Sequence, residues 1–189
     1  MRWYPSSRRS LIGAAAVLAI AGAGMAFAAP PSGTGNPQYT SGPTNEGVTV
    51  QQGQFRDIIS GSVQGVGNNN LTFLGQADAV ALYACQNNGG NFPTDPKKQS
   101  KAAKVEAETN VQADNGHASF AVALLAPAST LNCPGSQHPV PVCAQFSKKR
   151  VTVFVGATIV IPETAASPAT QSLILFPQFT DACNAIFAP

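Results

Sequence analysis

The chain has 189 residues, with 11 basic and 9 acidic side chains, and a formal net charge of +2. Three of the basic residues lie among the first nine positions, and without that N-terminal segment the net charge falls to about −1. The remaining lysines form loose clusters without aromatic residues between them, which excludes a nucleic-acid-binding surface. The length fits one domain with a tail.

The N-terminus has the pattern of a secretory signal peptide. Arginines precede an uncharged stretch, Leu11–Ala29, and the small residues Ala26 and Ala28 around Phe27 predict cleavage after Ala28. The alternative is a retained N-terminal anchor. The pair Arg8-Arg9 partly matches a twin-arginine export signal, so both that route and the general secretory route stay open. We therefore expect residues 1–28 to be removed, and the mature protein to be extracellular or in the cell envelope and not in the membrane.

The next segment, residues 29–54, is dense in Pro, Gly, Ser, Thr, Asn and Gln and has almost no large apolar side chains. Such a composition buries too little apolar surface to offset the entropy of ordering. We predict a flexible leader here, in which only residues 48–50 have the composition to contact the edge of the domain.

From Phe55 onward the pattern changes to a period of two. Phe55–Val63 and Leu71–Cys85 are predicted strands, separated by a turn rich in Gly and Asn. In Lys104–Val111, small or branched residues alternate with polar ones, as in a half-buried strand. The turn Asp114-Asn115-Gly116 predicts a hairpin into a further strand, His117–Leu125.

The C-terminal third contains one long loop and two more predicted strands. Residues Pro127–Pro141 are a predicted loop, rich in Pro. Arg150–Ile161 is rich in Val, Ile, Thr and Phe and is predicted as one strand with a bend or bulge at Gly156. Thr170–Phe176 is a further strand, and one helical turn is expected around Asp181–Ile186.

Many short strands with turn signals between them indicate an all-β domain over residues 55–189. We predict an antiparallel, immunoglobulin-like β-sandwich of about seven strands. A small closed barrel is the alternative.

The motifs in this order resemble a group of small secreted β-sandwich proteins common in actinobacteria. The resemblance covers residues 58–161 and includes the strand ending YACQNNGGN, the strand NGHASFAVALL, Cys133-Pro134 and a final strand rich in Val and Thr. The chain departs from the pattern after Pro134, where Gly135-Ser136 replaces Asn-Pro and an aromatic residue. That group is largely without assigned function, so the resemblance implies the fold and export but no reaction.

Four cysteines in an exported chain predict two disulfide bonds, with three possible pairings. The entropy of loop closure does not decide, because it is nearly the same for Cys85–Cys133 with Cys143–Cys183 as for Cys133–Cys143 with Cys85–Cys183. The resemblance implies one of them, because the cysteine after the long apolar strand and the one in Cys-Pro recur in that group. On that basis we expect Cys85 to pair with Cys133, and the additional cysteines, Cys143 and Cys183, to pair with each other.

The residues that most often carry catalysis lie in unpromising positions. His117 follows a hairpin turn and His138 lies in the Pro-rich loop, so both are expected to be solvated. Ser62 lies on a strand without the sharp turn of a nucleophile elbow. Glu106 and Glu108 share one strand face, which is typical of the solvated side of a sandwich. No His or Cys spacing suits a metal. We therefore predict no catalytic, cofactor-binding or metal-binding residues, and a protein that is not an enzyme.

Binding to a partner is the remaining class of function. The only Trp, Trp3, lies in the predicted signal peptide, which argues against a sugar-stacking platform. Exposed sandwich edges pair with extended peptides in other proteins. We predict a secreted or envelope-associated, non-catalytic module, structural or bound to an extracellular protein or cell-wall component. The alternative is a small secreted enzyme or inhibitor of an extracellular hydrolase, acting through loops 86–101 or 127–141.

Overall fold

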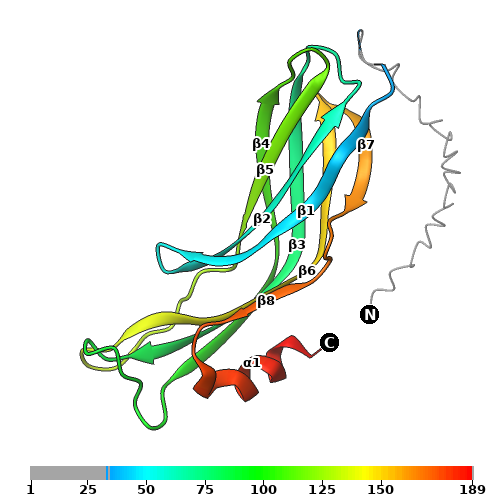
Figure 1. Ribbon diagram of the computed structural model, residues 1–189. Coiled ribbons are helices and arrows are strands. Elements are labelled where there is room, and N and C mark those ends of the chain that lie inside the picture. The colour runs from blue at the N-terminus through cyan, green and yellow to red at the C-terminus, as the bar shows by residue number, and fades with distance from the viewer. Residues whose placement is uncertain (1–32, 34, 189) are drawn as a thin grey trace, which may run out of the picture.

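Two antiparallel sheets pack face to face in the computed structural model, which describes residue 33 and residues 35–188 (Figure 1). The three-stranded sheet has the order β1 (Gln38–Gln51), β2 (Gln54–Gln64), β5 (His117–Leu125). The five-stranded sheet has the order β4 (Lys98–Gln112), β3 (Asn70–Gln86), β6 (His138–Val155), β7 (Thr158–Ala165), and β8 (Gln171–Ile174) also pairs with β6. A 3₁₀ turn (Pro177–Phe179) and helix α1 (Thr180–Phe187) follow. The predicted β-sandwich is confirmed.

The main core lies between the two sheets and follows the period-two pattern of the sequence. In β2, the side chains of Phe55, Ile59 and Val63 are fully buried. Across the sandwich, the rings of Phe73 in β3 and Phe120 in β5 stack with their centroids 4.3 Å apart. The alternation of apolar and polar residues in the sequence therefore identified the strands that form this core.

A second, smaller core lies where β3, β6 and β8 continue beyond the three-stranded sheet (Figure 1). Helix α1 covers this end of the five-stranded sheet. The buried residues of this core are Leu82, Ala84, Val142, Cys143, Phe179 and Cys183. The helix thus takes the place that a second sheet occupies in the rest of the sandwich.

The flexible leader predicted for residues 29–54 is wrong for residues 38–51, because these form strand β1. β1 pairs with β2 from Gln38 opposite Gln64 to Gln51 opposite Gln54. The strand is an edge strand with one buried residue, Pro43, and its register is interrupted three times. Backbone pairing holds it more than side-chain burial, because few of its side chains, such as Tyr39 and Val48, pack against the core, so its composition resembles that of a loop. The ordered domain therefore includes residues before Phe55.

Two other predicted boundaries also need correction. The single strand predicted over Arg150–Ile161 is the end of β6 and the first half of β7, joined by a turn in which Gly156 has φ of 57°. The run of β-branched residues reads as one strand, because a single glycine is the only turn signal between the two strands of the hairpin. The loop predicted to run to Pro141 ends earlier, because β6 begins at His138. Strand β8 and helix α1 confirm the predicted final strand and helical turn.

Within the described residues, none of the helices has the length and apolar character needed to cross a membrane. The predicted signal peptide, residues 1–28, lies outside the described part of the chain.

Candidate functional site

The four predicted disulfide cysteines are brought together in two pairs. Cys85, at the end of β3, is bonded to Cys133 in the loop after β5, and their Cα atoms are 5.5 Å apart. Cys143 in β6 is bonded to Cys183 in α1. This is the pairing that the resemblance implied, and it is confirmed. Each bond joins the five-stranded sheet to a segment outside it.

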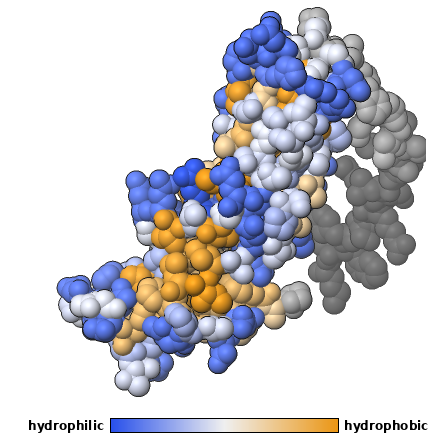
Figure 2. Space-filling model, in the orientation of Figure 1, coloured by the Kyte–Doolittle hydropathy of each residue, from blue (hydrophilic) through white to orange (hydrophobic). Residues whose placement is uncertain are grey.

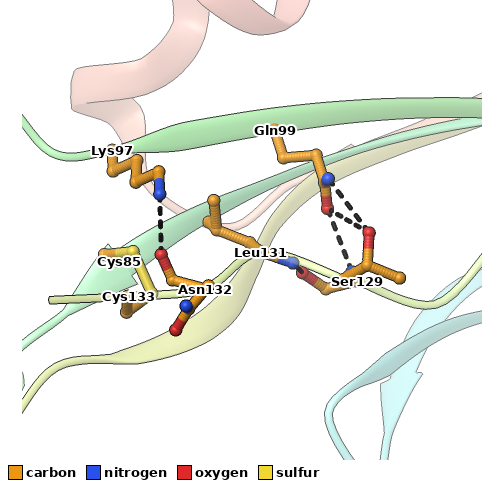
Figure 3. The surroundings of a disulfide bond; sticks show 8 residues. Cys85, Lys97, Gln99, Ser129, Leu131, Asn132 and Cys133 are labelled. Atoms are coloured by element: carbon orange, nitrogen blue, oxygen red, sulfur yellow. Dashed lines mark hydrogen bonds between the residues drawn. A yellow bond between two sulfur atoms is a disulfide. The ribbon is translucent and has the colours of Figure 1, made fainter.

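The loop between β5 and β6 is held against the start of β4 by the residues just before Cys133 (Figure 3). The Lys97 Nζ donates a hydrogen bond to the carbonyl oxygen of Asn132 over 2.9 Å. The Gln99 side chain accepts a hydrogen bond from the backbone N–H of Thr130 and donates one to the Thr130 hydroxyl. The disulfide and these bonds together fix the first half of loop 127–141.

The segment after Cys85 is an ordered turn. The Asn87 Oδ1 accepts hydrogen bonds from the backbone N–H groups of Gly89 and Asn91, at 3.0 and 2.9 Å. The Gln86 side chain donates to the carbonyl oxygen of Gly90, which has φ of 79°. The Asn and Gly residues of this motif therefore serve turn geometry.

A cavity of about 340 Å³ lies between loop 86–101 and the start of α1. Phe92 forms its apolar side and contacts Phe176 and Phe179 edge to face, with centroid separations of 4.9 and 4.8 Å. Lys98 and Asp181 lie on its rim. The cavity has the size of a small ligand site, with a charged group of each sign at its edge.

Hydrophobic side chains also gather on the surface near β8 and α1, where Figure 2 shows the most apolar area of the viewed face. Leu175, just after β8, is 37% exposed. Such an area is a candidate contact surface for another macromolecule.

The histidines and glutamates considered in the sequence occupy separate surface positions. His117 and His138 are exposed at the starts of β5 and β6. Glu106 and Glu108 are exposed on β4, and Glu106 accepts a hydrogen bond from Gln76. Among the described residues, these four side chains do not form a common site.

A polar cluster that sequence reasoning missed lies between the sheets. Asp57 in β2 and Lys149 in β6 are completely buried side chains, and Lys149 Nζ lies 3.4 Å from Asp57 Oδ2. The same Asp57 oxygen accepts a hydrogen bond of 2.7 Å from Asn45 Nδ2 in β1. An amine and a carboxamide thus share one carboxyl oxygen in the interior.

The orientation of the Asn45 carboxamide is fixed from its other side. Its Oδ1 accepts a hydrogen bond of 2.6 Å from the backbone N–H of Gly47. Gly47 follows a register irregularity in β1 and has φ of 114°, a backbone conformation that favours glycine. The local bend in β1 therefore turns a backbone donor toward the carboxamide oxygen.

Burial shapes the electrostatics of the pair. Desolvation raises the pKa of the Asp57 carboxyl, and the hydrogen bond from Asn45 and the charge of Lys149 oppose this in part. Desolvation likewise lowers the pKa of the Lys149 amine against the opposing effect of Asp57. Both shifts favour the uncharged forms, since water is excluded from the cluster.

Two sequence signals mark these residues. Asp57 falls between Phe55 and Ile59 in the alternating pattern of β2, so it belongs to the buried face. Lys149 lies two residues before Val151, so its side chain is on the same, inward-facing side of β6 at the start of the Val-rich run. A charged residue on an inward-facing position is the feature by which the cluster can be found.

Comparison with models of known protein families, with curated proteins and with solved structures finds no match to this chain.

Proposed function

We propose that this protein is a secreted or envelope-associated, immunoglobulin-like β-sandwich module without catalytic activity, which serves a structural role or binds an extracellular protein or cell-wall component. The observation that carries the proposal is the pair of disulfides, Cys85–Cys133 and Cys143–Cys183. Disulfides persist in oxidising compartments and are typical of exported proteins. Both bonds reinforce an extended sheet, as suits a scaffold.

The surface near β8 supports the partner-binding form of this proposal. Leu175, just after β8, is an exposed large hydrophobic side chain. An extracellular protein or a wall polymer with apolar groups is the kind of partner that would cover it.

The cavity beside Phe92 favours the second candidate function, a small secreted enzyme or inhibitor of an extracellular hydrolase. The cavity lies between loop 86–101 and α1, and the charged groups of Lys98 and Asp181 at its rim are available for polar contacts with a bound molecule. In this case loop 86–101 is the contact element.

The experiment uses the mature protein in two steps. N-terminal sequencing of material from the culture medium should begin at Ala29, and intact Met1 on membrane-bound material would contradict secretion. The mature protein is then used as bait with culture supernatant and isolated cell wall. Recovery of wall polymer or of a non-enzymatic surface protein supports the module, and recovery of a single hydrolase that the bait inhibits supports the alternative.

A matched pair of variants locates the contact. Leu175→Gln should reduce capture of the partner, whereas Ile159→Gln should not, although Ile159 is the more exposed side chain at 57%. Equal capture by both variants would contradict a role for the surface near β8.

A further inference from the structure

The cluster of the partly buried Asn45 and the buried Asp57 and Lys149 brings together the three groups required for an amide-forming reaction within one chain. Asp57 Oδ2 lies 3.4 Å from Lys149 Nζ and 2.7 Å from Asn45 Nδ2. We propose that Lys149 Nζ attacks Asn45 Cγ to form an intramolecular amide crosslink between β6 and β1, with Asp57 as the acid–base group. This inference goes beyond the proposed function and does not depend on it.

The backbone holds the two reacting residues in register. Ser167 accepts a hydrogen bond of 3.0 Å from the N–H of Asn45, and the neighbouring Ala166 donates one of 2.9 Å to the carbonyl oxygen of Lys149. Two adjacent residues of the segment after β7 thus bind the backbones of both reactants. Such fixed placement removes much of the entropic cost of bringing two groups together.

A bulge in β6 directs the lysine inward. Gln76 pairs with Arg150, and Asp78 pairs with Ser147, so β6 has one more residue than β3 at this point. Lys148 there has φ of 50°, is exposed and pairs with Asp78 at the surface, whereas Lys149 points into the interior. Bulges commonly redirect a side chain in this way.

The environment supplies the protonation states that the reaction needs. A lysine is a nucleophile only as the neutral amine, and desolvation lowers the pKa of Lys149. A general acid must hold a proton, and desolvation raises the pKa of Asp57. The Gly47 N–H donates to Asn45 Oδ1, where negative charge develops during attack.

The reaction balances without an oxidant or co-reactant. The Nζ lone pair forms the Nζ–Cγ bond, and the carbonyl electron pair moves to Oδ1. The Asp57 carboxyl gives its proton to Nδ2, and its carboxylate then takes one proton from Nζ. The Cγ–Nδ2 bond breaks, its electron pair leaves with ammonia, and the carbonyl re-forms. The products are a secondary amide and one ammonia, which is a loss of about 17 Da.

Intact-mass spectrometry of the reduced, denatured mature protein tests the proposal. We expect a mass about 17 Da below the sequence mass, and a branched peptide in which Asn45 and Lys149 are joined. The full sequence mass would overturn the crosslink. A loss of about 18 Da mapped to Asp57 and Lys149 would also overturn it, because Asp57 would then be the electrophile.

Three variants separate the crosslink from other losses of ammonia. Lys149→Met and Asp57→Asn should both have the full sequence mass, and Lys148→Asn, which changes the exposed neighbour, should keep the loss. A loss that persists in Lys149→Met would reveal cyclisation of an asparagine and overturn the proposal, and one that persists in Asp57→Asn would overturn the role of Asp57. Circular dichroism and the mass of the oxidised protein establish whether each variant folds with both disulfides. If a variant does not fold, the mass of the wild-type protein decides whether the crosslink forms.

Discussion

Gly75 in β3 lies so close to Val122 in β5 that a Cβ atom at position 75 would come within 2.7 Å of Val122 Cγ1. The two residues belong to opposite sheets, so this contact sets how closely the sheets approach at the centre of the sandwich. Glycine is required at position 75 because a side chain would not fit between the sheets. The backbone conformation does not require glycine, since φ of Gly75 is not positive.

The first prediction concerns this contact. Gly75→Ala should lower the free energy of unfolding by about 1–3 kcal/mol, because the added methyl group forces the sheets apart or Val122 out of its rotamer. Denaturant unfolding measures the change. Gly89→Ala is the control, because its nearest neighbour would be the Asn87 side chain at 3.4 Å and the cost should be small. Equal effects of the two variants would contradict the role of the sheet contact.

The second prediction concerns the Cys143–Cys183 bond. Replacing both cysteines with Ser should destabilise the protein by about 4 kcal/mol from loop entropy, and α1 should lose its protection from hydrogen exchange. The helix has eight residues, which is too short to persist alone.

The matched control is the Cys85–Cys133 pair, which closes a loop of similar length, 48 against 40 residues of separation. Its removal should cost a similar free energy and leave α1 protected. If α1 exchanges equally slowly in both variants, the packing of Phe179 rather than the disulfide holds the helix.

The third prediction concerns the histidines. His117 and His138 are exposed at strand starts, and replacing both with Ala should change Tm by less than about 3 °C. Differential scanning calorimetry and the capture assay check this together. A loss of partner capture with an unchanged Tm would identify a binding role for one of these side chains.

The fold was predictable where apolar and polar residues alternate strictly along a strand. The spacing of Phe55, Ile59 and Val63 is enough to indicate β2 and its buried face. β1 could not be found in this way, because an edge strand is held by backbone pairing and its side chains carry little information. The β6–β7 hairpin was missed because both strands have the same composition.

The buried cluster was only partly predictable. Alternation places Asp57 on the inner face of β2, but the pairing of Asp57 with Lys149 depends on the β6 bulge and on contact between strands distant in sequence. Asn45 lies in β1, which the sequence indicated as flexible. A site built across two sheets needs the sheets to be placed first.

The last prediction concerns the ionisation of Tyr39 in β1. Burial raises the pKa of its hydroxyl to about 12, because the charged phenolate would be desolvated. The unfolded chain releases the same proton near pH 10, so above that pH the folded state binds more protons than the unfolded state. The contribution of Tyr39 to stability is therefore complete below about pH 10 and is lost as the pH rises toward about 12.

Denaturant midpoints measured from pH 9 to pH 12 test this, with Tyr39→Phe as the comparison. The wild type should lose more stability over this range than the variant, because the variant has no proton to release at position 39. The two proteins differ only at position 39, so the difference between the two curves isolates the Tyr39 hydroxyl. Parallel curves would mean that the Tyr39 hydroxyl is solvated and that β1 is less firmly packed at its start than the structure has it.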